Sequence, residues 1–488
     1  MLKQRAFNAT LWSGIDILLR QGLQFMVLVV LARLVAPGEF GTVALLGLFT
    51  AVATVLVDGG LSMALIQRQD TDHVDVSTAF WCNLAFAICA AIGMLLISPG
   101  VAAFYRVPVL EPMMRLMALN VVVGALGAVH VALLRKHLRF RKQMLIGAAA
   151  AAAAGALAVA MALHGAGAWS LLAQVIGGTA VTTALLWITS DWRPAWVFSR
   201  ASARRLFGFG GYYMAASLLD TAYARLYTLL VGKLFGPREL GYYGNADATV
   251  QLPVGFLSGV FGRVLFPMFA AATTDDAVLR RGSQFAVRSM MLVSVPTMLG
   301  LAALAEPFVS TVFGAQWLPS APVLRVLCVA ALLTPLHMIN TQLLLARGDS
   351  RLLFRIELAK KLLGAGLMFA VAPLGLLAIA WSQVAYSFIS FLLITRFTAR
   401  LLDYGAGPQL GDTAPIFLLG IAMAGLVCGL DRIWQAPAPL KLFVLAVVGA
   451  MFFGVGAYVF RIAAFEDALS VVRKADRPDQ DGRSGIAG

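Results

Sequence analysis

The segment LARLVAPGEFG (residues 31–41) recurs as VGKLFGPRELG (residues 231–241). Four aligned positions are identical, and most of the others are conservative replacements. Two shorter matches follow in the same order, both offset by 214 residues: Pro108-Val109-Leu110 with Pro322-Val323-Leu324, and LRFR (138–141) with LLFR (352–355). Three matches in one order at similar offsets indicate an internal repeat. The chain is therefore predicted to consist of two related halves.

The composition places both halves in a membrane. Of the 488 residues, 60% are hydrophobic and 13% are charged, and the mean hydropathy is +0.83. A soluble domain has about 45–50% apolar and about 25% charged residues. Soluble enzymes and nucleic-acid-binding modules are therefore excluded. The predicted fold is an all-α polytopic membrane protein.

Apolar runs of about 20 residues, the length that spans a bilayer, predict about fourteen transmembrane helices. Their approximate limits are 8–34, 40–66, 76–98, 110–134, 144–163, 168–189, 207–232, 241–267, 287–305, 321–346, 358–374, 376–395, 412–430 and 441–462. The repeat groups the first twelve into two six-helix lobes, residues 1–200 and 201–400, around a central cavity. An extra helix pair (401–464) and a polar, disordered cytoplasmic tail (465–488) follow. An even helix count makes the lobes parallel, as in transporters with a substrate site between two repeats.

The basic residues predict the orientation of these helices. With a cytoplasmic N-terminus, 27 of the 38 lysines and arginines lie on the cytoplasmic side, eight lie outside and three lie within spans. Cytoplasmic loops carry the excess of basic residues in membrane proteins, so both termini are predicted to be cytoplasmic. The cytoplasmic loops therefore account for the net charge of +14, and no nucleic-acid partner is predicted from it. The arginine-rich stretch 190–206 is predicted to form an interfacial amphipathic helix on the cytoplasmic face.

Charges within the spans are candidate functional residues, because a charge at mid-bilayer costs about 2.5–3.5 kcal/mol on insertion scales and so faces a partner or a watery cavity. The first span carries Asp16 and Arg20 on one face. Its repeat partner carries Asp220 and Arg225, and the next span carries Arg263. Two interpretations stay open. Either Asp16 and Arg20 form an ion pair that only holds helices together, or these residues line the cavity, where arginines bind phosphate oxygens of an anionic head group.

Asp58, in the sequence VDGG, either caps a break in the second helix or couples an ion. With Asp16 and Asp220 it is a candidate for exchanging a proton or Na⁺. The sequence has no ATP-binding phosphate loop and no metal-spaced His/Cys cluster, so no cofactor, metal site or catalytic residue is predicted. Energy is expected from an ion gradient, from the membrane potential or from consumption of the substrate on the far side. The short loops argue against a membrane polymerase or ligase, so the chain is not expected to be an enzyme.

Three stretches resemble the Wzx-type polysaccharide flippases: GLSMALIQRQDTDHVDVSTAFWCNLAFA (60–87), LVAPGEFG (34–41) and ALAEPFVSTVFGAQW (303–317). They are most similar to the colanic acid and teichuronic acid exporter branch of the multidrug/oligosaccharidyl-lipid/polysaccharide exporter superfamily. The resemblance implies two lobes in a V shape. It also implies alternating access that flips an undecaprenyl-diphosphate-linked oligosaccharide from the cytoplasmic to the periplasmic leaflet of the bacterial inner membrane, for exopolysaccharide or lipopolysaccharide biosynthesis.

The resemblance further implies a cationic cavity for the diphosphate, with Arg20, Arg225 and Arg263 as candidates and Asp16 and Asp220 beside them. The expected partners are the lipid-linked oligosaccharide, membrane lipid, and a polysaccharide polymerase with its assembly proteins. Relatives that flip peptidoglycan precursors carry arginine on the second helix. In this sequence the only mid-depth charge of the second helix is Asp58, which argues against lipid II as the substrate. The alternative function is an ion-coupled multidrug or organic-cation antiporter of the same superfamily, whose cavity should be net acidic. A non-transporting scaffold is a further alternative.

Overall fold

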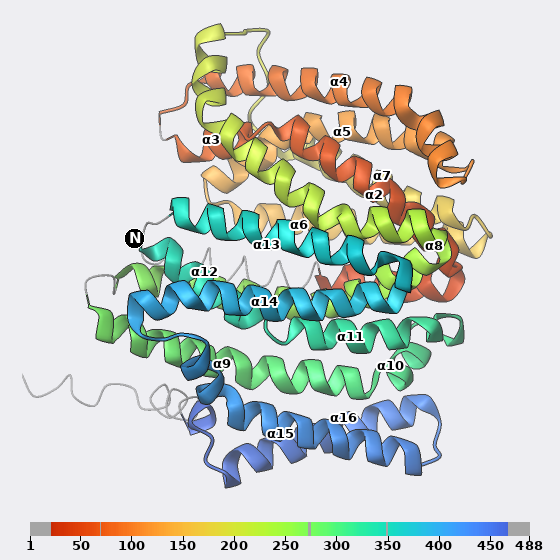
Figure 1. Ribbon diagram of the computed structural model, residues 1–488. Coiled ribbons are helices and arrows are strands. Elements are labelled where there is room, and N and C mark those ends of the chain that lie inside the picture. Colours follow the sequence, from red (N-terminus) through yellow and green to blue (C-terminus); the bar gives the residue numbers. More distant parts are fainter. Residues whose placement is uncertain (1–20, 69, 272–274, 348–349, 467–488) are drawn as a thin grey trace, which may run out of the picture. The chain divides into compact units, whose positions relative to one another are not determined.

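The computed structural model shows a chain of helices joined by short turns (Figure 1). It describes residues 21–68, 70–271, 275–347 and 350–466. No β-strand occurs within these ranges. The chain divides into two compact units, unit 1 (Met1–Asn245) and unit 2 (Ala246–Gly488). The lobe boundaries at residues 200 and 400 stay predictions.

Unit 1 is built around α5. Its elements are a first helix over Gln21–Leu34, α2 (Pro37–Asp58), α3 (Leu61–Gln67), α4 (His73–Tyr105), α5 (Leu110–Lys136), α6 (Phe140–Leu163), α7 (Ala168–Thr189) and the first part of α8 (Arg200–Ala271). The neighbours of α5 are α2, α3, α4 and α7, and α6 packs along α7. Residues on several faces of α5 are consequently buried, including Met113, Ala125 and Val129.

The local sequence explains where these helices begin and end. Pro37 occupies the first turn of α2, where its missing N–H costs nothing, and Glu39 Oε2 accepts a hydrogen bond from the Ala36 N–H at 3.1 Å. Gly59 and Gly60 have φ values of 52° and 71° and separate α2 from α3. Glycine adopts this left-handed conformation without a steric penalty. Asp72 caps α4 by accepting a hydrogen bond from the Asp75 N–H at 2.7 Å.

The two copies of the repeat motif contact each other within unit 1. A β-carbon placed on Gly41 would lie 1.7 Å from the carbonyl oxygen of Pro237. A β-carbon placed on Gly241 would lie 1.9 Å from the carbonyl oxygen of Pro37. Both distances are far shorter than any van der Waals contact, so only a residue without a side chain permits this approach of one backbone to the other. The contact is reciprocal, because each motif offers the same glycine to the same proline of the other.

Unit 2 contains the rest of α8 and all later helices: α9 (Asp276–Ala303), α10 (Ala305–Val312), α11 (Ala321–Ala331), α12 (Thr334–Ala346), α13 (Ser350–Val371), α14 (Leu376–Leu402), α15 (Ala406–Ile433) and α16 (Ala438–Val459). Two short 3₁₀ helices, η1 (Ala315–Ser320) and η2 (Ala372–Leu374), lie between them. The last two helices form a hairpin, shown in dark blue in Figure 1, and α15 packs on α9.

The described part of every predicted span is helical apart from short breaks, which fall at residues 59–60, 304, 332–333 and 460–462. Ten helical segments in the described part of the chain are long and apolar enough to cross a bilayer. The first helix, α8 and α13 are not among these ten. The all-α, multi-pass membrane fold is therefore confirmed, whereas the count of fourteen spans stays a prediction.

The predicted interfacial helix over 190–206 is wrong for its first ten residues. Residues 190–199 are not helical, and α8 begins at Arg200. Pro194 lacks an N–H donor and disfavours helical geometry in the residue before it. Side chains of α4 replace the helical hydrogen bonds: the Trp81 indole N–H donates to the Ala195 carbonyl at 2.8 Å, and the Ala195 N–H donates to Ser77 at 3.2 Å.

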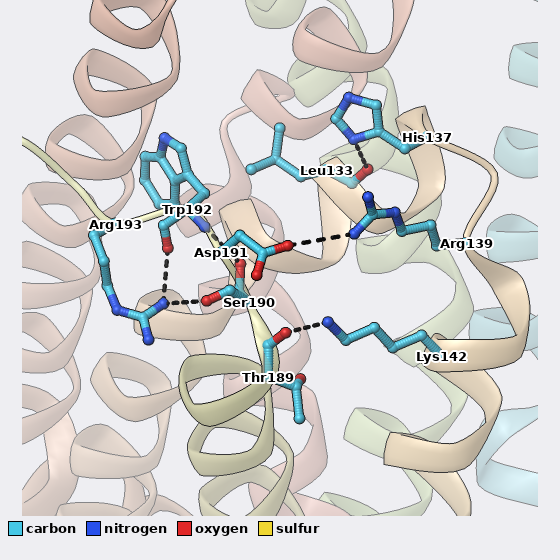
Figure 2. A network of polar contacts seen from close by, with 9 residues as sticks. All are labelled: Leu133, His137, Arg139, Lys142, Thr189, Ser190, Asp191, Trp192 and Arg193. Carbon is cyan, nitrogen blue, oxygen red and sulfur yellow. Dashed lines mark hydrogen bonds and ion pairs between the residues drawn. The ribbon is translucent and has the colours of Figure 1, made fainter.

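The same segment is also held at the start of α6 and the end of α7 (Figure 2). The Lys142 ammonium donates to the Thr189 carbonyl, and Arg139 forms an ion pair with Asp191 at 3.7 Å. Arg193 donates to the carbonyl of Ser190 at 2.6 Å. Backbone carbonyls that a longer helix would satisfy are thus satisfied by cationic side chains, which fixes the path of the chain into α8.

A buried polar cluster in unit 2 attaches α15 to α9 and α12. Asp412 accepts hydrogen bonds from Arg288 at 2.6 Å and from the Tyr404 hydroxyl at 2.8 Å. The side-chain amides of Asn340 and Gln409 bond each other reciprocally, both at 2.9 Å. Burial, followed by the hydrogen bond to Asp412, raises the pKa of Tyr404, which lies outside the spanning segments. The phenol therefore stays protonated and keeps donating.

Replacing Asp412 with asparagine should destabilise unit 2. The neutral amide cannot compensate the partly buried Arg288 guanidinium, and loss of one partner of a buried charged pair costs about 1–3 kcal/mol. The measurement is the apparent melting temperature of the purified protein in detergent. Arg280 and Asp403 provide a matched control, because that pair is 40% and 96% exposed, and exposed pairs contribute little. If Arg280→Ala and Asp412→Asn lowered the melting temperature equally, the partial burial of the Arg288–Asp412 pair would not explain its contribution to stability.

Candidate functional site

A cavity in unit 1 has a volume of about 750 Å³. Its wall is formed by the first helix, α5, α6 and α7. Glycine and alanine residues of α5 and α6, including Gly127, Gly147, Ala151 and Ala154, leave this space open. Its polar lining consists of Gln24, Arg135, Gln143, Gln174, Thr179, Thr182 and Thr183. We call this cavity the glutamine-lined hollow.

The three glutamine side chains of this hollow make no hydrogen bond to another described residue. The Oε1 atom of Gln143 is buried and unpartnered, and Gln24 and Gln174 also form no side-chain bond within the described part of the chain. An unsatisfied amide at membrane depth costs free energy unless it meets water or a ligand. The hollow therefore suits a polar, hydrogen-bonding occupant.

A second cavity of about 510 Å³ lies between α2, α3, α5, α7 and the first part of α8. We call it the Asp58 hollow, and its polar lining consists of Thr50, Thr54, Asp58, Ser62, Asn120, Arg135, Thr179 and Ser217. Asn120 is only 9% exposed, and its Oδ1 atom has no partner among the described residues. The break predicted at VDGG is present, but no side chain caps α3. Asp58 is half-buried and lines the hollow.

One face of α5 forms a common wall of both hollows. Gly124, Ala128, Val131 and Arg135 line both cavities, together with Thr179 of α7. Their spacing of four, three and four residues places them along one side of a helix. Arg135 is exposed and forms no ion pair with another described residue. A guanidinium in this position can bind an anionic group that enters either hollow.

The sequence prediction identified only part of this site. Asp16 and Arg20 lie outside the described residues, as does the side chain of Arg263, although its backbone belongs to α8. Asp220 and Arg225 are exposed on the unit 1 part of α8, and neither lines the two hollows. Their roles in substrate binding, and the roles of Asp16, Asp58 and Asp220 in ion coupling, stay predictions.

Arg135 and Gln143 were not recognised as site residues from the sequence, because Arg135 belongs to a basic cluster that the positive-inside rule already explains. The periodic pattern of α5 was the available signal. Asn120, Gly124 and Ala128 recur every four residues and lead to Arg135 on the same face. A polar and small-residue stripe that ends at an arginine indicates a cavity wall rather than a lipid-facing surface.

Unit 2 contains a different kind of cavity. An apolar groove of about 540 Å³ lies between α9, α10, α15 and α16. Its lining includes Pro296, Phe308, Met423, Leu445 and Phe453, and Thr297 is its one residue with a polar side chain among those described. Such a surface suits a hydrocarbon chain and offers no recognition of a charged group.

Comparison with known families agrees with this combination of membrane helices and polar hollows. The family model described as "Polysaccharide biosynthesis protein" matches residues 30–322. The chain belongs to this family. The resemblance to Wzx-type flippases of the multidrug/oligosaccharidyl-lipid/polysaccharide exporter superfamily is thereby confirmed.

Proteins similar to this chain come from several bacteria. The chain is 27% identical over 459 residues to the teichuronic acid biosynthesis protein TuaB of Bacillus subtilis, covering 92% of this chain and 94% of the relative. It is 28% identical to the lipopolysaccharide biosynthesis protein WzxC of Escherichia coli, covering 74% of each chain. It is 30% identical to the succinoglycan biosynthesis transport protein ExoT of Rhizobium meliloti, covering 66% of each chain.

Solved structures show the same fold at low sequence identity. The inward closed conformation of the lipid II flippase MurJ superposes with a TM-score of 0.74 at 12% identity, covering 95% of this chain and 99% of MurJ. An inward-facing multidrug resistance transporter of the MATE family gives 0.62 at 15% identity, covering 80% of this chain and 95% of the transporter. These likenesses concern the fold alone, so the lining of the hollows must distinguish a glycolipid flippase from a drug transporter.

Proposed function

We propose that this protein flips an undecaprenyl-diphosphate-linked oligosaccharide from the cytoplasmic to the periplasmic leaflet of a bacterial inner membrane. The observation that carries the proposal is the guanidinium of Arg135 on the wall shared by two polar hollows, where it forms no ion pair with another described residue. A cation and neutral hydrogen-bonding groups match a phosphorylated glycan. The family relationship to polysaccharide biosynthesis proteins supports the same conclusion and supports a transporter rather than an enzyme.

The lining argues against the multidrug or organic-cation antiporter. An organic cation is bound by carboxylates and by aromatic faces. The described lining of the glutamine-lined hollow contains neither kind of side chain, and its one charge is positive. The Asp58 hollow holds one carboxylate together with the same arginine, so its described lining has no net negative charge.

The proposed cycle is alternating access. The head group enters from the cytoplasmic side and binds Arg135, with Arg20, Arg225 and Arg263 as further candidates. The lipid tail stays in the bilayer, where the apolar groove of α9, α15 and α16 provides a surface for it. Rocking of one lobe against the other then exposes the head group to the periplasm. Both termini are proposed to be cytoplasmic, and a polysaccharide polymerase with its assembly proteins is proposed to receive the product.

A coupled ion would make the cycle directional. Asp58 is the described candidate, because a half-buried carboxylate in a polar hollow can bind a proton or Na⁺. Asp16 and Asp220 are the other two candidates from the sequence. The protein is proposed to need no cofactor beyond this ion.

The direct test is transport in proteoliposomes. The purified protein is reconstituted with a polyprenyl-diphosphate oligosaccharide that carries a fluorophore on the sugar, and a membrane-impermeant quencher reports the fraction in the outer leaflet. The protein should accelerate movement of the label relative to protein-free liposomes. A protein that leaves the label in place but exports ethidium would instead be a drug antiporter. If the protein transported neither compound, the result would favour a non-transporting scaffold.

A further inference from the structure

The glutamine side chains of the glutamine-lined hollow occupy three different depths along α6. The first helix runs parallel to α6, because Leu31 and Val35 cluster with Ala158 and Ala162. A β-carbon on Gly155 would meet Val27 at 2.5 Å, so Gln24 lies about level with Ala151. The lining of α6 alone, from Gln143 to Ala154, extends about 16 Å at 1.5 Å per residue.

Gln174 lies beyond Gln24 in the direction from the start of α6 toward its end. α7 follows α6 after a short turn and packs along it. Gly177 of α7 lies beside Ala154 and Leu157, which places Gln174, about one turn earlier in α7, near the level of Leu157. The backbone positions of Gln143, Gln24 and Gln174 are thus staggered by about two helical turns each, or roughly 11 Å. Arg135 lies at the Gln143 end, because α5 ends where α6 begins.

We propose that this row of amides binds the sugar portion of the transported glycolipid. The inference rests on the proposed function and deepens it. Each amide offers an acceptor and donors to hydroxyl groups, and the staggered spacing lets one chain of sugars meet all three. The small residues between them, such as Gly147 and Ala151, leave room for the sugar rings. With no acidic residue in its described lining, the hollow accepts neutral sugars along its length and an acidic group at Arg135.

This arrangement makes the hollow a determinant of specificity for glycan length. A short glycan reaches only the amide nearest Arg135, whereas a longer one also reaches Gln24 and Gln174. A site built to hydrogen-bond hydroxyl groups discriminates strongly against a ligand that leaves its amides unpaired. The row should therefore contribute to transport of an oligosaccharide and contribute little to transport of a single sugar.

The test compares two fluorescent lipids in the proteoliposome assay: a polyprenyl diphosphate with a tetrasaccharide and one with a monosaccharide. The variant with both Gln24→Leu and Gln174→Leu, the two amides that only a longer glycan reaches, should move the tetrasaccharide lipid at least about tenfold more slowly, since each lost hydrogen bond to a hydroxyl contributes several-fold. Its rate with the monosaccharide lipid should stay within about twofold of wild type. Gln67→Leu is the matched control, because Gln67 is exposed on α3 and lines neither hollow.

A second variant fills the hollow without removing an amide. Ala151→Leu should slow the tetrasaccharide lipid about as much as the double variant, whereas Ala152→Leu should not, since Ala152 is exposed and outside the lining. Equal slowing of both lipids, or wild-type rates for both Ala151→Leu and the double variant, would overturn the inference. A wild-type protein that moves neither lipid would instead refute the proposed function. The two failures are therefore distinguishable.

Discussion

Arg135→Gln should lower the rate of lipid-linked oligosaccharide transport by about 10- to 100-fold. Arg135 is the one charged residue shared by the linings of the two hollows, within the described part of the chain. A hydrogen bond to a charged group contributes about 1.5–3 kcal/mol, and each 1.4 kcal/mol corresponds to a factor of ten. Glutamine keeps a similar length and polarity but loses the charge. The initial rate in the proteoliposome quenching assay measures the effect.

Two further variants test whether this effect is specific to the hollow. Arg135→Lys should retain part of the activity, because lysine keeps the charge but loses the two-pronged geometry that matches phosphate oxygens. Arg200→Gln removes an exposed arginine that lines neither hollow, and its rate should stay within about twofold of wild type. If Arg135→Gln transported as fast as Arg200→Gln, the shared wall of α5 would not be the anion site.

Gly41→Ala and Gly241→Ala should each reduce transport at least about tenfold and lower the apparent melting temperature. The added methyl group would overlap the carbonyl oxygen of Pro237 or Pro37, at 1.7 Å and 1.9 Å. A clash with backbone is not relieved by a change of rotamer, so the two turns must move apart. Overpacking of this kind typically costs about 1–3 kcal/mol. Thermal unfolding in detergent and the transport assay measure the two effects.

The matched control lies three residues away in the same turn. A β-carbon on Gly38 would have only atoms of Arg238 as neighbours, at 3.9 Å, which is an ordinary contact. Gly38→Ala should therefore transport and melt like the wild-type protein. If Gly38→Ala and Gly41→Ala lowered transport and melting temperature equally, the contact between the two turns would not be the cause.

The sequence predicted the helical segments well because their signals are local. Apolar runs, Pro37 at a helix start and Gly59-Gly60 at a break each depend on a few neighbouring residues. The stretch 190–199 was predicted wrongly, because its hydrogen-bond partners Ser77, Thr78 and Trp81 lie more than a hundred residues away. No periodic pattern within the stretch contains that information.

The candidate site was predicted only in outline. Cations and carboxylates near one another were expected, but which of them share a cavity depends on how helices pack. Arg135 has the same sequence signature as its neighbours Lys136 and Arg139, and only the position of α5 against α7 separates them. Gln143 was equally inconspicuous, since a glutamine one turn into a helix is usually solvated. The unpartnered Oε1 of Gln143 is visible only in three dimensions.

The reciprocal contact of Pro37 with Gly241 and of Pro237 with Gly41 has the geometry of an isologous interface, in which one surface patch pairs with a copy of itself. Such an interface needs only one kind of patch. A shorter chain with a single copy of the motif would carry both the proline and the glycine that a homodimer needs to form the same contact. Fusion of two copies would have made that association permanent and left each copy free to diverge.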